Sequence, residues 1–173
     1  MYENVKNAIR DIPDFPKKGI IFKDVTTAIK RPEIFKEIID FFVNELKNTD
    51  FDYIAAIESR GFFLAAPIAY LMGKGLILIR KPGKLPSTTY KASYELEYGT
   101  DSLEIHTDAI ENGKKVVIMD DLIATGGTLG ASIDLIKQSG AIPLKALFLI
   151  ELEALKGRER FESQIDIISM LKF

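Results

Sequence analysis

The chain has 173 residues, of which 47% are hydrophobic and 28% charged, and its formal net charge is −2. This length suits one domain with a sizeable core, so we expect residues 1–173 to form a single domain. The small net charge provides no global basic field, which argues against a nucleic-acid partner. The absence of cysteine excludes disulfides and thiolate chemistry.

The N-terminal residues lack the apolar core of a signal peptide, and no run of about 18 apolar residues occurs that would span a membrane. We therefore expect a cytoplasmic protein with no membrane partner.

The first part of the chain alternates between helix-like and strand-like segments. Residues 1–30 show no regular period. Apolar residues then recur at helical spacing, which predicts an amphipathic helix over residues 33–47. Further along, residues 53–57 predict a buried strand, 58–61 a loop, 62–72 an apolar helix ending at Gly73, and 76–80 a second strand.

Residues 81–101 are the least regular stretch of the sequence. They contain Pro82, Gly83, Pro86 and Gly99 and have no helical period, so we expect a functional or mobile loop rather than a packed element. Residues 102–106 predict a short strand that could pair with the far side of this loop.

The remainder again alternates between strands and helices. Asn112-Gly113 marks a turn into a strand at residues 115–119, and Gly140 ends the helix that follows. Residues 144–150 and 165–171 predict two more strands. This alternation, without repeats, predicts an α/β fold with a mostly parallel central sheet flanked by helices.

An acidic pair that runs into a glycine-threonine loop is the most informative feature of the chain. Residues 116–119 predict a strand buried on both faces, and Asp120 and Asp121 follow at its carboxyl end, where open α/β sheets bind ligands. The small residues 125–128 let backbone N–H groups converge on a phosphate at a helix N-terminus. A sugar phosphate fits both features, because its hydroxyls suit the two carboxylates and its phosphate suits the loop. The alternative is a tight βα connection, and the loop is neither a Walker A motif nor Gly-x-Gly-x-x-Gly.

A second polar loop, residues 58–61, also follows a strand and precedes a helix. Its N–H groups and Arg60 predict a second anion site facing the first, although a surface salt bridge is the alternative for Arg60. Arg80, Lys81 and Lys84 lie at the end of the next strand. Such runs are commonly solvated basic turns, although their place at a strand end beside the long loop would also suit binding of an anion.

Residues 116–128 resemble the signature of the type I phosphoribosyltransferases, which use 5-phosphoribosyl-1-pyrophosphate. Collinear segments over nearly the whole chain are similar to the adenine-specific branch of this family, namely residues 14–24, 58–62, 78–86, 92–99 and 151–158. The resemblance implies the type I fold, with residues 1–30 contributing to a small hood over the base and with a flexible catalytic loop. It implies transfer of the 5-phosphoribosyl group to adenine, giving AMP and pyrophosphate, with Mg²⁺ held mainly by the substrate. It also implies a homodimer.

The resemblance assigns the phosphoribosyl and pyrophosphate sites. Asp120 and Asp121 bind the 2- and 3-hydroxyls of ribose, next to the carbon that becomes positively charged. The 5-phosphate is held by Ala124, Thr125, Gly126, Gly127 and Thr128. Pyrophosphate is bound by Ser59, Arg60, Arg80, Lys81 and Lys84, and the loop at Ser59 contains a non-proline cis peptide bond.

The resemblance also assigns the adenine site. Phe22 and Leu152 sandwich the base, for which ordinary core packing is the alternative role. Backbone groups of Ile21 and Lys23 read the edge of the base, and many family members carry Arg where this chain has Lys23.

The catalytic loop carries the proposed general acid/base. The resemblance places Glu97, next to Tyr98, in the role of taking the proton from N7 of adenine so that N9 becomes nucleophilic. Glu95 is its competitor on spacing alone.

Two other functions remain open. A regulator of the same fold would bind the sugar phosphate or nucleic acid, but this chain keeps the loop acid and has no spare length for a DNA-binding domain. A phosphoribosyltransferase for hypoxanthine, guanine or xanthine is the alternative within the enzyme class.

Overall fold

A five-stranded parallel sheet forms the centre of the computed structural model, which describes residues 2–95 and 99–173. The strand order is β4–β3–β7–β8–β9, and each neighbouring pair runs parallel. The strands are β3 (Tyr53–Ile57), β4 (Gly75–Ile79), β7 (Lys115–Ile123), β8 (Ile142–Glu151) and β9 (Asp166–Lys172). The predicted α/β class and the predicted strands are confirmed.

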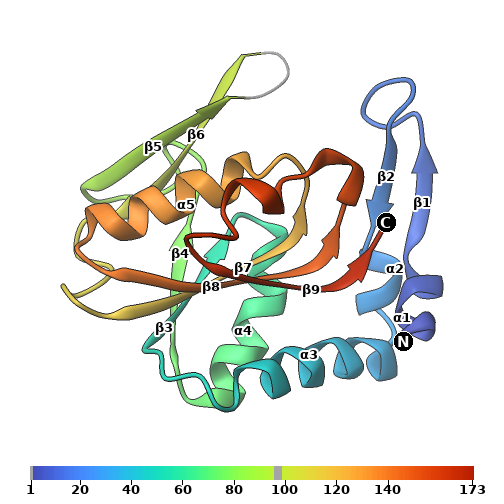
Figure 1. Cartoon of the computed structure of the whole chain (residues 1–173), viewed down its shortest axis with the longest axis horizontal. Coiled ribbons are helices and arrows are strands. Elements are labelled where there is room, and N and C mark those ends of the chain that lie inside the picture. The colour runs from blue at the N-terminus through green and yellow to red at the C-terminus, as the bar shows by residue number, and fades with distance from the viewer. Residues whose placement is uncertain (1, 96–98) are drawn as a thin grey trace.

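Helices cover both faces of this sheet (Figure 1). Helix α5 (Gly127–Gln138) lies on one face, and α3 (Pro32–Leu46) and α4 (Arg60–Met72) lie on the other. The amphipathic period of α3 buries five side chains, and Pro32 suits its first turn because its φ angle is already helical. Helix α4 ends at Gly73 in the left-handed conformation, as the sequence predicts.

Strand β7 is longer than predicted. Its pairing with β8 continues through Leu122 and Ile123, so Asp120 and Asp121 lie inside the strand rather than just beyond it. Backbone hydrogen bonding to β8, which the apolar pattern does not reveal, carries the strand past the polar pair.

An antiparallel hairpin corrects the expectation of irregular structure over residues 81–101. Strand β5 (Thr89–Glu95) pairs with β6 (Thr100–His106) along its full length, from Thr89 opposite His106 to Glu95 opposite Thr100. The predicted strand at residues 102–106 is confirmed, but the loop prediction is wrong for residues 89–95. Strand β5 buries only Ala92, so no alternating pattern marks it in the sequence.

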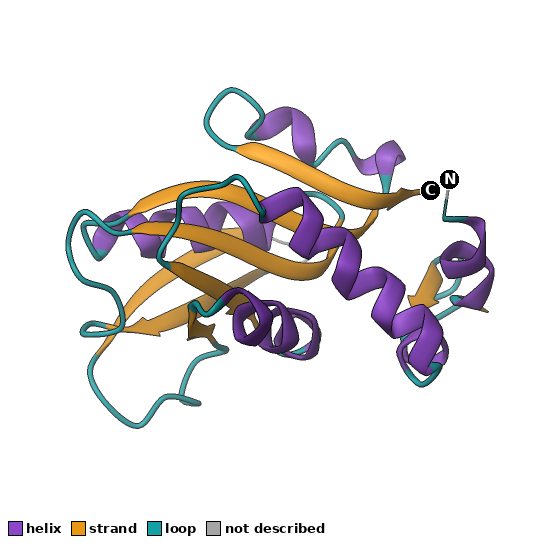
Figure 2. Ribbon diagram, turned by 90° about the horizontal axis from the view of Figure 1, so that it is seen from below, coloured by secondary structure: helices purple, strands orange, loops and turns teal. Residues whose placement is uncertain are grey.

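The N-terminal residues form short elements at one end of the sheet, near the C-terminus (Figure 2). These elements are α1 (Glu3–Ala8), β1 (Arg10–Pro13), β2 (Ile21–Asp24) and α2 (Thr26–Ile29), and β1 pairs with β2 as an antiparallel hairpin. Elements of this length are too short for a hydrophobic period to appear, which explains why the sequence shows none. In the part of the chain that the structure describes, no helix has the length and apolar character to cross a membrane.

Candidate active site

A cavity of about 300 Å³ opens where β3 and β7 end, and both predicted anion loops line it. The predicted residues that line it are Ser59, Arg60, Lys81, Asp120, Asp121, Ala124, Thr125, Gly126, Gly127 and Thr128. The parallel strands bring these residues together because each loop follows the carboxyl end of a neighbouring strand.

The acidic pair is almost completely buried, with Asp120 8% and Asp121 3% exposed. The backbone N–H of Asp121 donates to Oδ1 of Asp120 at 2.8 Å. Oδ2 of Asp121 lies 3.1 Å from Nε of Arg60 as an ion pair, yet it has no hydrogen-bond donor among the described residues. A buried carboxylate oxygen without a donor is costly, so this atom is suited to a ligand that brings one.

Burial raises the pKa of Asp120 well above its ordinary value, and the charge of Asp121 adds to the rise. Burial also raises the pKa of Asp121, although the Arg60 guanidinium opposes this shift. Two carboxylates held together in this way favour a ligand that carries positive charge or hydroxyl donors.

The loop after β7 leads directly into the first turn of α5. Gly126 is the N-cap and has a φ of 83°, which favours glycine, and a Cβ there would come within 2.8 Å of the Phe161 ring. The first N–H groups of a helix have no partners within the helix, so they are available to an anion. The loop therefore has the geometry of a phosphate cradle.

The loop after β3 faces the acidic pair. The Glu58–Ser59 peptide bond is cis, as the resemblance implied. A Cβ on Gly61 would come within 2.6 Å of the Met119 carbonyl oxygen, so only glycine lets the start of α4 approach the middle of β7 this closely. This contact holds Arg60 next to Asp121.

The three basic residues after β4 occupy different environments. The Arg80 guanidinium pairs with Glu58 at 3.1 Å, whereas Lys84 is exposed and, like Arg80, lies outside the cavity lining. The Lys81 ammonium pairs with Asp101 and lies 2.9 Å from the Tyr94 hydroxyl.

Hydrogen-bond partners shift the pKa values of Lys81 and Glu58. Burial lowers the pKa of Lys81, but its bonds to Asp101 and Tyr94 outweigh this effect and the net shift is upward. Desolvation raises the pKa of Glu58, yet the Lys81 N–H and the Arg80 guanidinium lower it overall. Sequence reasoning missed both acids as partners. Glu58 lies in the quoted motif, but nothing in the sequence marks Asp101.

The predicted base-binding residues lie outside the lining of this cavity. Phe22 and its neighbours Ile21 and Lys23 belong to β2, and the Arg60 guanidinium lies 4.9 Å from the Phe22 ring centroid. Leu152 follows β8 and packs against the core on the α3 side of the sheet. Arg60 therefore joins the N-terminal hairpin to the acidic pair.

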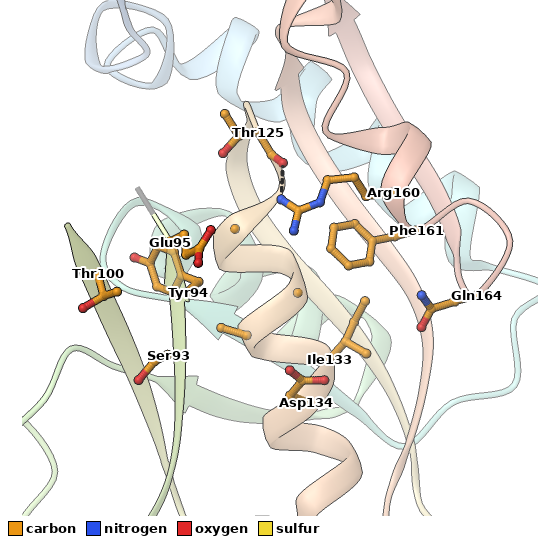
Figure 3. A pocket seen from close by; sticks show the side chains of 13 residues that line it. Ser93, Tyr94, Glu95, Thr100, Thr125, Ile133, Asp134, Arg160, Phe161 and Gln164 are labelled. Carbon is orange, nitrogen blue, oxygen red and sulfur yellow. Dashed lines mark hydrogen bonds between the residues drawn. The ribbon is translucent and has the colours of Figure 1, made fainter. Parts of the chain in front are cut away.

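The catalytic-loop residues Glu97 and Tyr98 lie outside the described residues. Glu95 ends β5 and lines a second, larger cavity of about 780 Å³ beside the first turns of α5 (Figure 3). Tyr94 contributes to both cavities.

A metal ion would find few protein ligands here. Among the described residues, no group of three or more His, Cys, Asp or Glu side chains is placed to hold one. The two carboxylates of the acidic pair nevertheless match the oxygen donors that Mg²⁺ prefers when a substrate supplies its other ligands, and Oδ2 of Asp121 has no hydrogen-bond donor among the described residues.

Residues 25–172 match the family model described as the phosphoribosyl transferase domain, which agrees with the paired anion loops and defines the chain as a phosphoribosyltransferase. Within that class, the chain belongs to the adenine phosphoribosyltransferases. The protein of that name from Thermoanaerobacter sp. (strain X514) is 52% identical over 171 residues, which cover 99% of this chain and 98% of the relative.

Solved structures agree with this family. The crystal structure of adenine phosphoribosyltransferase from Thermoanaerobacter pseudethanolicus is 51% identical, with a TM-score of 0.96 and coverage of 100% of both chains. The Saccharomyces cerevisiae protein, solved with an imino-altritol bisphosphate and adenine, is 39% identical with a TM-score of 0.93, and the match covers 98% of this chain and 97% of that one.

Proposed function

We propose that the chain transfers the 5-phosphoribosyl group from 5-phosphoribosyl-1-pyrophosphate to adenine in the cavity at the ends of β3 and β7. The buried acidic pair carries this proposal, because both anion loops line its cavity and Oδ2 of Asp121 has no hydrogen-bond donor among the described residues. A sugar with two hydroxyls and an anion at each end satisfies all three features. The proposed location of this reaction is the cytoplasm, as expected from the sequence.

The acidic pair would orient the ribose and stabilise its transition state. A ribose hydroxyl would donate to Oδ2 of Asp121, and the negative pair would favour the positive charge that develops at C1 when pyrophosphate leaves. Residues 124–128 would hold the 5-phosphate with N–H groups and with the Thr125 and Thr128 hydroxyls.

The loop after β3 would bind the departing pyrophosphate. Ser59, Arg60 and Lys81 line the same cavity as the phosphate cradle. Mg²⁺ carried by the phosphates and ribose hydroxyls, next to Asp120 and Asp121, would supply additional positive charge to the leaving group. Arg80 and Lys84 would contribute to this charge from outside the lining.

Adenine would bind between Phe22 and Leu152, under a hood that residues 1–30 help to form. The S. cerevisiae relative, whose fold is similar over nearly the whole chain, is named as a complex with adenine. Backbone groups of Ile21 and Lys23 would bond the 6-amino group and N1, and Glu97 would take the proton from N7.

Purine specificity tests this function. With 5-phosphoribosyl-1-pyrophosphate held constant, we expect adenine to be converted at least about 100-fold more efficiently than hypoxanthine, guanine or xanthine, because a backbone C=O opposite a 6-oxo group leaves two acceptors unpaired. Product formation by chromatography with each base measures this ratio. Equal use of hypoxanthine would contradict specificity for adenine. Binding of the sugar phosphate without turnover of any base would support a regulator.

A homodimer is also proposed, and an exposed apolar patch supports it. The patch consists of Tyr70 and Leu71 at the end of α4 and Leu76 and Leu78 on the edge strand β4, with exposures of 85%, 59%, 40% and 39%. Apolar patches of this kind commonly mark interfaces. An isologous contact through this edge would place the basic residues after β4 symmetrically at both sites.

Sedimentation tests this assembly. We expect a dimer for the unmodified chain and a shift towards monomer for Leu71→Glu, because the charge must be desolvated at the interface. Ile142→Glu is the matched control, since Ile142 is also exposed (48%) but lies outside the patch. A chain that sediments as a fully active monomer would exclude catalysis by a neighbouring subunit.

A further inference from the structure

The phosphate loop is supported by a segment that the sequence analysis did not connect with it. Residues 157–161 contact the loop but do not line the 300 Å³ cavity. A Cβ on Gly157 would come within 2.2 Å of the Ala124 carbonyl oxygen, and one on Gly130 within 2.9 Å of the Phe161 ring. The segment therefore packs directly against the loop and the first turn of α5.

Arg158 anchors this segment to the sheet. Its guanidinium donates to both carboxylate oxygens of Glu151, at 2.8 and 2.5 Å, and to the Ile167 carbonyl oxygen at 2.6 Å. Glu151 is 6% exposed, so the pair is well shielded. Because Arg158 begins the short 3-10 helix η2 (Arg158–Arg160), this anchor fixes the direction in which the next residues project.

Arg160, at the other end of η2, reaches the phosphate loop itself. Its Nη1 donates to the Thr125 carbonyl oxygen at 2.9 Å, a contact seen in Figure 3. No carboxylate in the described part of the chain forms an ion pair with Arg160, whereas Arg158 is paired with Glu151. Within the described residues, the charge of Arg160 is therefore not neutralised by a neighbouring acid.

The Thr125 carbonyl belongs to the same peptide group as the Gly126 N–H. A cation bound to the oxygen polarises the peptide, which strengthens the N–H as a donor, and it also fixes the plane of the peptide. The N–H of Gly126 lies in the loop assigned to the 5-phosphate.

We propose that Arg160 is a positioning residue for the 5-phosphate, which orients and polarises the Thr125–Gly126 peptide from outside the substrate cavity. This inference rests on the proposed function of residues 124–128. Arg160 has no contact with substrate in this role, so its removal should weaken binding of the phosphate end of the substrate selectively.

Binding and kinetics of three variants test this role. For Arg160→Met we expect the KM for 5-phosphoribosyl-1-pyrophosphate and the Kd for ribose 5-phosphate to rise about fivefold to tenfold, the order of one ordinary hydrogen bond, because the effect on the phosphate is indirect. The KM for adenine and kcat should change less than about twofold. Arg160→Lys should recover at least half of the loss on a logarithmic scale, because it keeps a cationic donor. Lys156→Gln, which removes a nearby exposed cation that pairs only with Glu159 among the described residues, should leave both constants unchanged.

The outcomes separate this inference from the proposed function. Unchanged ribose 5-phosphate binding in Arg160→Met would overturn the inference, as would equal rises in the KM of both substrates with a lowered Tm, since that pattern indicates general loosening of the fold. Thr128→Ala separates the role of Arg160 from the proposed function of the phosphate loop, because the Thr128 hydroxyl is assigned to the phosphate directly. If Thr128→Ala weakens ribose 5-phosphate binding and Arg160→Met does not, only the role of Arg160 is wrong. If the unmodified chain fails to bind ribose 5-phosphate, the proposed function itself is wrong.

Discussion

Replacing Asp120 and Asp121 together by asparagine should lower kcat by about 100-fold or more, because the positive charge at C1 would lose its stabilising carboxylates. Asparagine retains the side-chain oxygen that accepts the Asp121 N–H, so the strand should keep its local hydrogen bond. Initial rates with both substrates at saturation measure the effect, and circular dichroism checks the fold. The exposed Asp108→Asn is the matched control and should retain full activity.

The same double variant should unfold at a higher temperature than the unmodified chain at neutral pH. Burial raises the pKa of both carboxyl groups in the folded state, so the folded chain loses stability as pH rises above the pKa of the unfolded groups. Asparagine does not titrate, so the advantage of the variant should appear above about pH 4 and vanish below it. Thermal unfolding across pH 3–8 measures this difference.

For the activity of the double variant, wild-type rates in a folded protein would contradict the assignment of Asp120 and Asp121 to the ribose.

Glu97→Gln should lower kcat by about 100-fold or more while changing the KM of either substrate far less. Glutamine keeps the size and a possible hydrogen bond but cannot take the proton from N7 of adenine. Initial rates over a range of each substrate separate kcat from KM.

Glu95→Gln is the matched control for this prediction, because it makes the same change two residues away. Glu95 is exposed at the end of β5 and lines the larger cavity, away from the acidic pair, so its replacement should be nearly silent. If Glu95→Gln loses activity and Glu97→Gln does not, the loop register implied by the family resemblance is wrong and Glu95 is the acid/base.

Closure of the catalytic loop stays a prediction. The family resemblance implies a flexible catalytic loop, and we expect residues 86–99 to close when both substrates bind, yet residues 89–95 form a paired strand in the structure. Any closure must therefore be compatible with the pairing of β5 and β6 along residues 89–95 and 100–106. Contact between Tyr94 and Gly127, where a Cβ would come within 2.8 Å of the Tyr94 ring, couples the hairpin to the phosphate loop.

The sequence by itself determined the elements whose residues repeat with a clear period, and the two loops whose chemistry is local. The helix at residues 33–47, the buried strands and the left-handed Gly73 follow from spacing and from backbone freedom within a few residues. Both anion loops follow from small or charged residues at the ends of predicted strands, and the structure brings them to one cavity.

Only the tertiary structure decided which charged groups meet. Asp101 lies 20 residues from Lys81 in sequence, and Arg160 lies 35 residues from Thr125, yet each pair is in contact. Strand β5 likewise exists because β6 supplies its hydrogen bonds, with almost no burial to mark it. Such contacts form because the packing of the whole sheet brings distant segments together. A local pattern of residues therefore cannot predict them.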